Sequence, residues 1–184
     1  MTVLDLCLCA MMIAIHIALE LLPTTIRIGN DYKISFATLP FVLIGMLCGP
    51  VEGLVTGLVG TFLSQMLGPY GLMFTTVLWI IPGMMTGLAA GLIYKAFKRR
   101  IKIVPIIITV FGSGLVLTVF NLAASYLDGV VIEKYWTPEV VYALIPIRIV
   151  IWLLTFAAYT VVIMPLCKTL QKRLPAGYRQ AEKG

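Results

Sequence analysis

The chain has 184 residues, of which 60% are hydrophobic and 12% are charged. Soluble domains average roughly 25% charged residues, so this composition excludes a water-soluble globule and favours a protein whose solvent is largely lipid. The formal charge of +6 is concentrated in two clusters between or after apolar segments, which argues against a nucleic-acid partner.

The first apolar segment spans residues 3–22. It lacks a basic leader and a cleavage site, so we expect a retained membrane span and not a signal peptide. Alanine returns at every fourth position, as Ala10, Ala14 and Ala18. Small side chains at this spacing allow another helix to approach closely, and the spacing alone favours a seam inside the bundle.

The same segment carries His16 and Glu20 on one helical face. One interpretation is a proton relay or ion site, and a carrier of that kind would work without an ATPase. We prefer a second interpretation, in which the two residues form a polar pair satisfied within the bundle. One histidine and one acid are few titratable groups for a proton-driven pump.

The next segments are a polar connection and two tightly joined spans. The connection, residues 23–35, holds the turn signal Gly29-Asn30-Asp31. Spans are predicted at about 34–49 and 51–67. The second has small residues at the spacing of close helix packing, namely Gly53, Gly57, Gly60 and Ser64.

Three further spans are predicted at about 74–97, 103–126 and 138–171. The last is longer than a bilayer requires, so we expect it to project past the membrane or to break near Pro165. Arg148 lies well inside this span, where a charge is costly unless it faces protein, water or a partner anion.

The basic residues predict the orientation. Of the fourteen Lys and Arg residues, ten lie in the last turns of the fourth or the sixth span or just after them, and they share one side of the membrane only if six helices alternate. The positive-inside rule then places both termini in the cytoplasm. Binding of lipid head groups or nucleotide is the alternative role of these clusters, which are Lys95, Lys98, Arg99, Arg100 and Lys102, and Lys168, Lys172, Arg173, Arg179 and Lys183.

Polar and aromatic side chains recur at similar depth in the outer halves of separate spans. This pattern predicts a cavity open to the outside with aromatic walls, and interhelical hydrogen bonds are the alternative. Apart from Glu20, no acid could lie at the depth of Arg148. A cavity there would therefore contain a cation without a partner, and we expect it to receive an anionic group of a ligand. The aromatic pair Tyr135-Trp136 in the last outer loop is interpreted as an interfacial belt.

No catalytic or metal motif is present in the sequence, so we expect no enzyme activity, metal or cofactor. The cysteines are interpreted as small buried hydrophobes, and they are Cys7, Cys9, Cys48 and Cys167. The inverted repeats of a self-sufficient secondary transporter are also missing. A binding subunit driven by another protein fits these observations.

The segment "YKISFATLPFVLIGMLCGPVEGLVTGLVG" (32–60), with the later "FNLAASYLDG" and "IPIRIVIWLL", resembles the substrate-binding S components of energy-coupling factor (ECF) vitamin transporters, in particular the folate-type subgroup. The resemblance covers nearly the whole chain. One departure is Thr61, where folate-type members often carry an acid.

The resemblance implies one all-α integral membrane domain over residues 1–184, with six transmembrane helices, in the plasma membrane of a prokaryote. It implies a cup that binds a water-soluble vitamin from outside, closed by the first outer loop as a lid. The cup would associate with a transmembrane scaffold (the T component) and two cytoplasmic ATPases, and would topple to deliver the vitamin. In this family the alanine pattern of the first span faces the scaffold, so Ala10, Ala14 and Ala18 become the expected docking face.

The leading hypothesis is therefore an S component for an anionic vitamin, folate or pantothenate, with pyridoxine fitting less well. Arg148 is expected to bind a carboxylate and Asn121 to form a hydrogen bond. The other expected site residues are Trp79 and Trp152 in the walls, Gln65 and Tyr70 as secondary contacts, and Arg27 and Lys33 in the lid. The rival hypothesis is a structural or chaperone-like membrane subunit without a small ligand.

Overall fold

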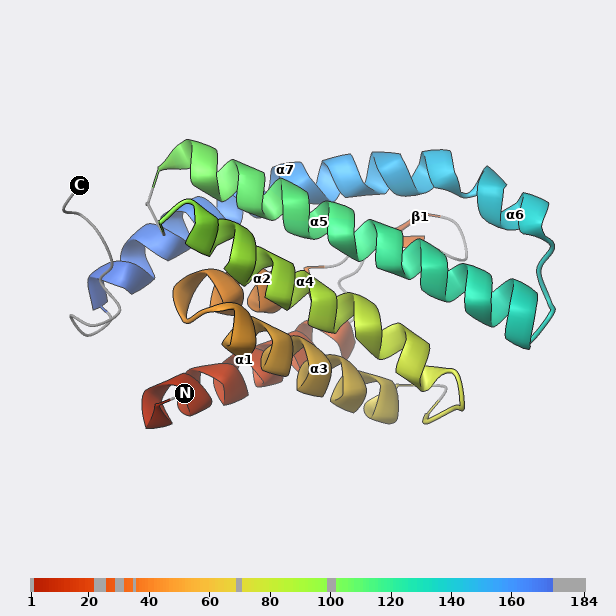
Figure 1. The fold of residues 1–184 in the computed structure, drawn as a ribbon, viewed down its shortest axis with the longest axis horizontal. Coiled ribbons are helices and arrows are strands. Elements are labelled where there is room, and N and C mark those ends of the chain that lie inside the picture. Colours follow the sequence, from red (N-terminus) through yellow and green to blue (C-terminus); the bar gives the residue numbers. More distant parts are fainter. Residues whose placement is uncertain are drawn as a thin grey trace.

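Long apolar helices laid side by side form the molecule (Figure 1). The computed structural model describes residues 2–21, 26–28, 32–34, 36–68, 71–98 and 102–173. In chain order the elements are helix α1 (Val3–Leu21), strands β1 (Ile26–Ile28) and β2 (Tyr32–Ile34), helices α2 (Leu39–Leu47), α3 (Pro50–Leu67), α4 (Thr76–Ala96) and α5 (Ile103–Tyr126), the π-helical segment η1 (Leu127–Ile132), and helices α6 (Pro138–Ala143) and α7 (Ile145–Arg173).

Within the described residues, four helical segments are long and apolar enough to cross a membrane: Val3–Leu21, Thr76–Ala96, Ile103–Ile132 and Pro138–Cys167. They correspond to the first, fourth, fifth and sixth predicted spans. α3 has 18 residues but is less apolar, because glycine and polar side chains interrupt it. α2 has nine residues, all buried, and at a rise of about 1.5 Å per residue it is far too short to span a bilayer alone. Six crossings therefore stay a prediction.

Two predicted spans differ from the observed helices. The span predicted at 34–49 is helical only at 39–47, and its first turn contains Pro40, where the missing N–H costs no helical bond. The span predicted at 138–171 breaks at Leu144, and α7 runs on through Pro165. In a continuous helix the ring of Pro146 would clash with the carbonyl of Tyr142, so the chain breaks just before it.

A short hairpin precedes α2. Strand β1 pairs antiparallel with β2, and Arg27 lies opposite Lys33. The all-α prediction missed this hairpin, although the predicted turn at 29–31 is consistent with it. Residues 29–31 themselves, and the side chains of both strands, lie outside the described part of the chain.

Glycine lets α3 and α4 approach at backbone distance. A Cβ built on Gly53 would lie 2.3 Å from the carbonyl oxygen of Gly87, and one on Gly57 would lie 2.3 Å from that of Gly83. No side chain fits at such distances, so the predicted close packing of these α3 glycines is confirmed. The backbone contact fixes how α3 and α4 cross, and both helices contribute to the cavity described below.

Replacing Gly87 by alanine is expected to destabilise the protein, because its Cβ would lie 2.1 Å from the carbonyl oxygen of Gly53. Overpacking of this kind costs about 1–3 kcal/mol, or roughly 2–10 °C in melting temperature for a chain of this size. The matched control is Gly112→Ala, whose Cβ meets only the flexible end of Ile93. Equal melting temperatures for the two variants in detergent would contradict the prediction.

The start of α1, the end of α4, the start of α5 and the end of α7 lie toward one end of the bundle (Figure 1). Six alternating helices require this grouping, and the exposed Lys95 and Lys98 lie there. The hydrophobic core occupies the same half, because it joins the last turns of α4 to the first turns of α5, as at Tyr94 and Ile106. Which end faces the cytoplasm stays a prediction.

The cysteines follow their interpretation as buried hydrophobes in two cases. Cys9 and Cys167 are buried, Cys48 is half-buried, and Cys7 is exposed. The interpretation was wrong for Cys7, because the face of α1 that carries it points away from the other helices.

Candidate functional site

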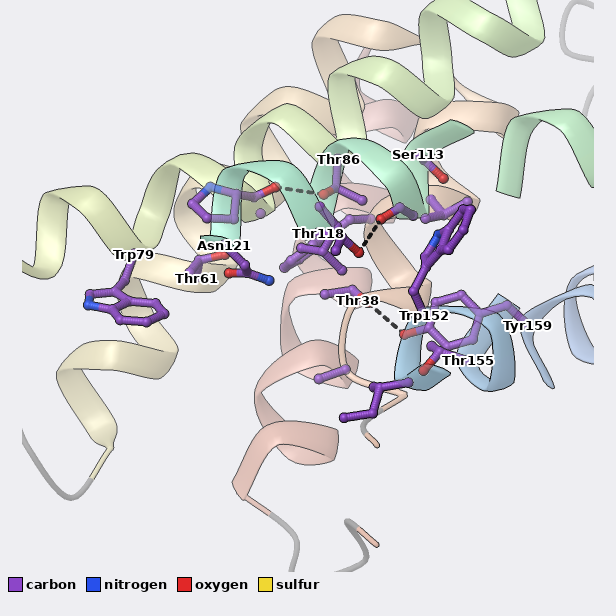
Figure 2. A pocket seen from close by; sticks show the side chains of 18 of the residues that line it. Thr38, Thr61, Trp79, Thr86, Ser113, Thr118, Asn121, Trp152, Thr155 and Tyr159 are labelled. Atoms are coloured by element: carbon purple, nitrogen blue, oxygen red, sulfur yellow. Dashed lines mark hydrogen bonds between the residues drawn. The ribbon is translucent and has the colours of Figure 1, made fainter. Parts of the chain in front are cut away.

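A cavity of about 520 Å³ lies between α1, α2, α3, α4, α5 and α7, and it adjoins the hydrophobic core, because Val42, Val110 and Tyr159 belong to both. Its walls are mainly apolar, with polar side chains pointing inward (Figure 2). Five of the expected site residues line it: Gln65, Trp79, Asn121, Arg148 and Trp152. Tyr70 lies outside the described residues, and so do the side chains of Arg27 and Lys33, whose backbone lies in the hairpin.

Arg148 reaches the cavity from α7 and is held by α5. Its Nη2 donates to the Ser125 hydroxyl at 2.7 Å, and that hydroxyl donates to the Asn121 carbonyl at 2.8 Å. Its Nε is buried without a hydrogen-bond partner, and among the described residues it forms no ion pair. The guanidinium is thus fixed in place with unmatched charge and an unused donor.

Two further buried polar atoms on the cavity wall have no partner among the described residues, the indole Nε1 of Trp152 and the hydroxyl of Thr61. The Trp152 ring packs against Phe111 with centroids 4.4 Å apart. Buried polar groups in folded proteins nearly always have a hydrogen-bond partner. Their gathering around one cavity is what a site for a polar ligand requires.

Sequence reasoning missed several hydroxyl groups of the wall. The Thr38 hydroxyl lies 2.6 Å from that of Tyr159, and the Thr86 hydroxyl donates to the Pro82 carbonyl at 2.6 Å. A hydroxyl that bonds its own helix is hard to separate from ordinary helix packing. A signal was nevertheless available in the helical spacing on α7 of Arg148, Trp152, Thr155 and Tyr159, all of which line the cavity.

His16 lies on the inner face of α1 and lines the cavity. It is 3% exposed, with Nδ1 2.6 Å from the Ala37 carbonyl oxygen and Nε2 3.3 Å from the Ser64 hydroxyl. Its ring also contacts Phe41. The preferred interpretation of a residue satisfied within the bundle agrees with these contacts. It points to the side of α1 opposite Ala14 and Ala18.

A second cavity, of about 590 Å³, adjoins the first, and Gln65 and Trp79 line both. It also contains Asp128, which is 7% exposed and accepts a hydrogen bond from the Trp79 indole at 2.9 Å. The sequence reading considered Glu20 alone as an acid near the depth of Arg148. It missed Asp128 because residues 127–139 were expected to form an outer connection, whereas the helix that begins as α5 continues through this position as η1.

The segment between η1 and α6 supplies aromatic residues to both cavities. Trp136 lines the first, and Tyr135 lines the second while remaining 57% exposed. Partial burial, with the nearby charges of Asp128 and Glu133, raises the pKa of Tyr135, so this phenol stays neutral in ordinary buffers. The belt interpretation is therefore incomplete for Trp136.

The alanine stripe points away from the cavity. Ala10, Ala14 and Ala18 are exposed, while Cys9, Met12 and His16 face the bundle. A seam inside the bundle, which the spacing alone favoured, is wrong. The stripe lies on the outside, where another membrane helix can reach it.

The family model described as "ECF transporter, substrate-specific component" matches residues 4–167. The match runs from the first turn of α1 to beyond Pro165 in α7 and includes every described residue of the cavity. A search of curated proteins finds no match to this chain.

Proposed function

The chain belongs to the family of ECF transporter substrate-specific components, and on this premise we propose that it captures an anionic vitamin from outside in the cavity around Arg148. The family is the substrate-specific part of transporters that work with a T component and ATPases. Membership gives the class of activity, and the residues of the cavity support the choice of ligand.

One observation carries the choice of an anionic ligand. Arg148 is fixed by Ser125, has a buried Nε without a partner, and forms no ion pair with a described acid, although Glu20 also lines the cavity. Arg148 is half-buried, and its Nε is shielded from water. A charge held away from water without a partner is costly, and a carboxylate on the ligand would lower this cost with a bidentate hydrogen bond. Trp152 and Thr61 offer two further groups to the same ligand.

Folate and pantothenate both carry a carboxylate and are the leading substrates. A cavity of about 520 Å³ falls within the range of small-molecule sites, which are roughly 300–1,000 Å³. Pyridoxine has no negative group to match Arg148 and fits less well. The hairpin with Arg27 and Lys33 is proposed as the lid over the mouth of the cavity.

The exposed alanine face supports the proposed assembly. Ala10, Ala14 and Ala18 form a strip of small side chains on the face of α1 that points away from the bundle. In lipid, such strips favour close helix association. We assign this face to the transmembrane scaffold, which would join the protein to two cytoplasmic ATPases in the plasma membrane of a prokaryote. Delivery would follow from toppling of the whole bundle.

A thermal-shift screen of the purified protein against water-soluble vitamins tests the proposed function. A ligand that binds only the folded state at 100 times its Kd stabilises by about 2.7 kcal/mol, which corresponds to roughly 5–10 °C for a chain of this length. Folate or pantothenate is expected to give such a shift, and pyridoxine a smaller one.

The screen also separates the alternatives. No shift with any vitamin would favour a structural or chaperone-like membrane subunit. Vitamin uptake in vesicles that contain this chain without ATPases would favour a proton-coupled carrier, in which His16 and Glu20 would have the central role. ATP-dependent uptake that requires the T component would support the proposal.

A further inference from the structure

The end of α5 is not a loop but a helical turn of different pitch. From Leu127 to Ile132 the backbone is π-helical, and Glu133 N–H donates to the Asp128 carbonyl at 2.9 Å, five residues back. Such π-helical turns are rare and frequently occur at functional sites. Here the turn buries Asp128 and Gly129, and each contacts a different tryptophan of the cavity wall.

Asp128 fixes the indole of Trp79. The Trp79 Nε1 donates to Asp128 Oδ2 at 2.9 Å, and Asp128 is 7% exposed. Indole has one donor and no conventional acceptor, so this bond leaves Trp79 with only its ring to present to a ligand. Trp152, whose Nε1 has no partner among the described residues, lies on the other side of the cavity (Figure 2).

Gly129 positions Trp136. Trp136 N–H donates to the Gly129 carbonyl at 3.0 Å, and a Cβ on Gly129 would lie 2.7 Å from the Trp136 ring. The ring therefore packs directly on bare backbone. Trp79 and Trp136 both line the cavity, so two consecutive residues of η1 position two of its aromatic walls.

We infer that η1 builds an aromatic subsite, in which Asp128 and Gly129 act as positioning residues for Trp79 and Trp136. This inference rests on the proposed function and narrows it. The ligand carries a planar ring, which stacks on these indoles, in addition to the anionic group received by Arg148. An aliphatic anion would gain apolar contact from these indoles but no ring stacking.

The positioning is tested by NMR of protein labelled with ¹⁵N-tryptophan in detergent. The chain has three tryptophans, so the spectrum holds three indole N–H signals, assignable by single Trp→Phe substitutions. Asp128→Leu is expected to shift the Trp79 signal upfield while leaving that of Trp152 in place. Asp128→Asn, which keeps an acceptor oxygen, should shift it less. Glu133→Leu, at a nearby exposed acid, is the matched control. An unmoved Trp79 signal in Asp128→Leu would overturn the positioning whatever the ligand.

The subsite is tested with two probes, folic acid, which has aromatic rings and carboxylates, and pantothenate, which has a carboxylate and no ring. Asp128→Leu is expected to lower the affinity for folic acid about tenfold in the native protein. In a protein that already carries Trp79→Phe, the same substitution should lower it less than about twofold. Gly129→Ala should lower the affinity for folic acid and shift the indole N–H signal of Trp136. If pantothenate binds with dependence on Arg148 while folic acid does not bind, the proposed function stands and the aromatic subsite is overturned.

Discussion

Arg148→Ala is expected to lower vitamin affinity at least about 100-fold while the protein still folds and inserts. Removing one partner of a buried, hydrogen-bonded charge pair costs roughly 2–5 kcal/mol, and 100-fold corresponds to about 2.7 kcal/mol. Insertion should survive, because the lost hydrogen bond to Ser125 is one contact in a bundle held mainly by helix packing, and alanine removes a charge that is costly inside a membrane.

Titration of the purified variant in detergent measures this effect, and melting curves without ligand report the fold. Lys95→Ala removes an equal charge from an exposed position at the end of α4 and should leave the affinity unchanged. Arg148→Lys keeps the charge but loses the planar fork, so an intermediate affinity is expected. Native affinity in Arg148→Ala would remove this residue from the site.

Ala14→Trp is expected to leave vitamin binding intact and to abolish transport. Ala14 is exposed on the outer face of α1, and the face that carries His16 and the cavity wall lies opposite. A tryptophan there meets no other part of the bundle, but it would hold a partner helix away from the strip of small residues. Loss of complex assembly and of ATP-dependent uptake should follow together.

Co-purification with the T component and ATPases, followed by uptake in vesicles, measures the assembly. Ala157→Trp is the matched control, because Ala157 is an exposed alanine on α7, far along the chain from the stripe. It should assemble and transport like the native protein. Loss of folding or of vitamin binding in Ala14→Trp would contradict an outer docking face, and normal assembly would move the interface elsewhere.

The sequence predicted the main helices closely because lipid leaves the backbone few options. Inside a bilayer every N–H and C=O must be satisfied within the helix, so the apolar runs mark α1, α3, α4 and α5 almost to the residue. The same cost makes polar residues in a span conspicuous. Arg148 and Asn121 stood out for this reason, and the structure brings both to one cavity.

Other wall residues could not be found in this way, because their partners are distant in the chain. Thr38 meets Tyr159 across 121 residues, and Trp79 meets Asp128 across 49. Neither pair leaves a local pattern. The break at Leu144 was assigned to the wrong proline, since Pro165 and Pro146 both interrupt the same apolar run and only packing decides which one is tolerated.

By itself, then, the sequence determined a polytopic helical protein, the positions of its long helices and the charged residue at the centre of its candidate site. The tertiary structure decided which way each helix faces. A membrane helix is apolar on both its inner and its outer face, so hydrophobic periodicity does not tell the two apart as it does in water. Only the packed bundle placed His16 inside and Ala14 outside, and turned Asp128 from a loop residue into the partner of Trp79.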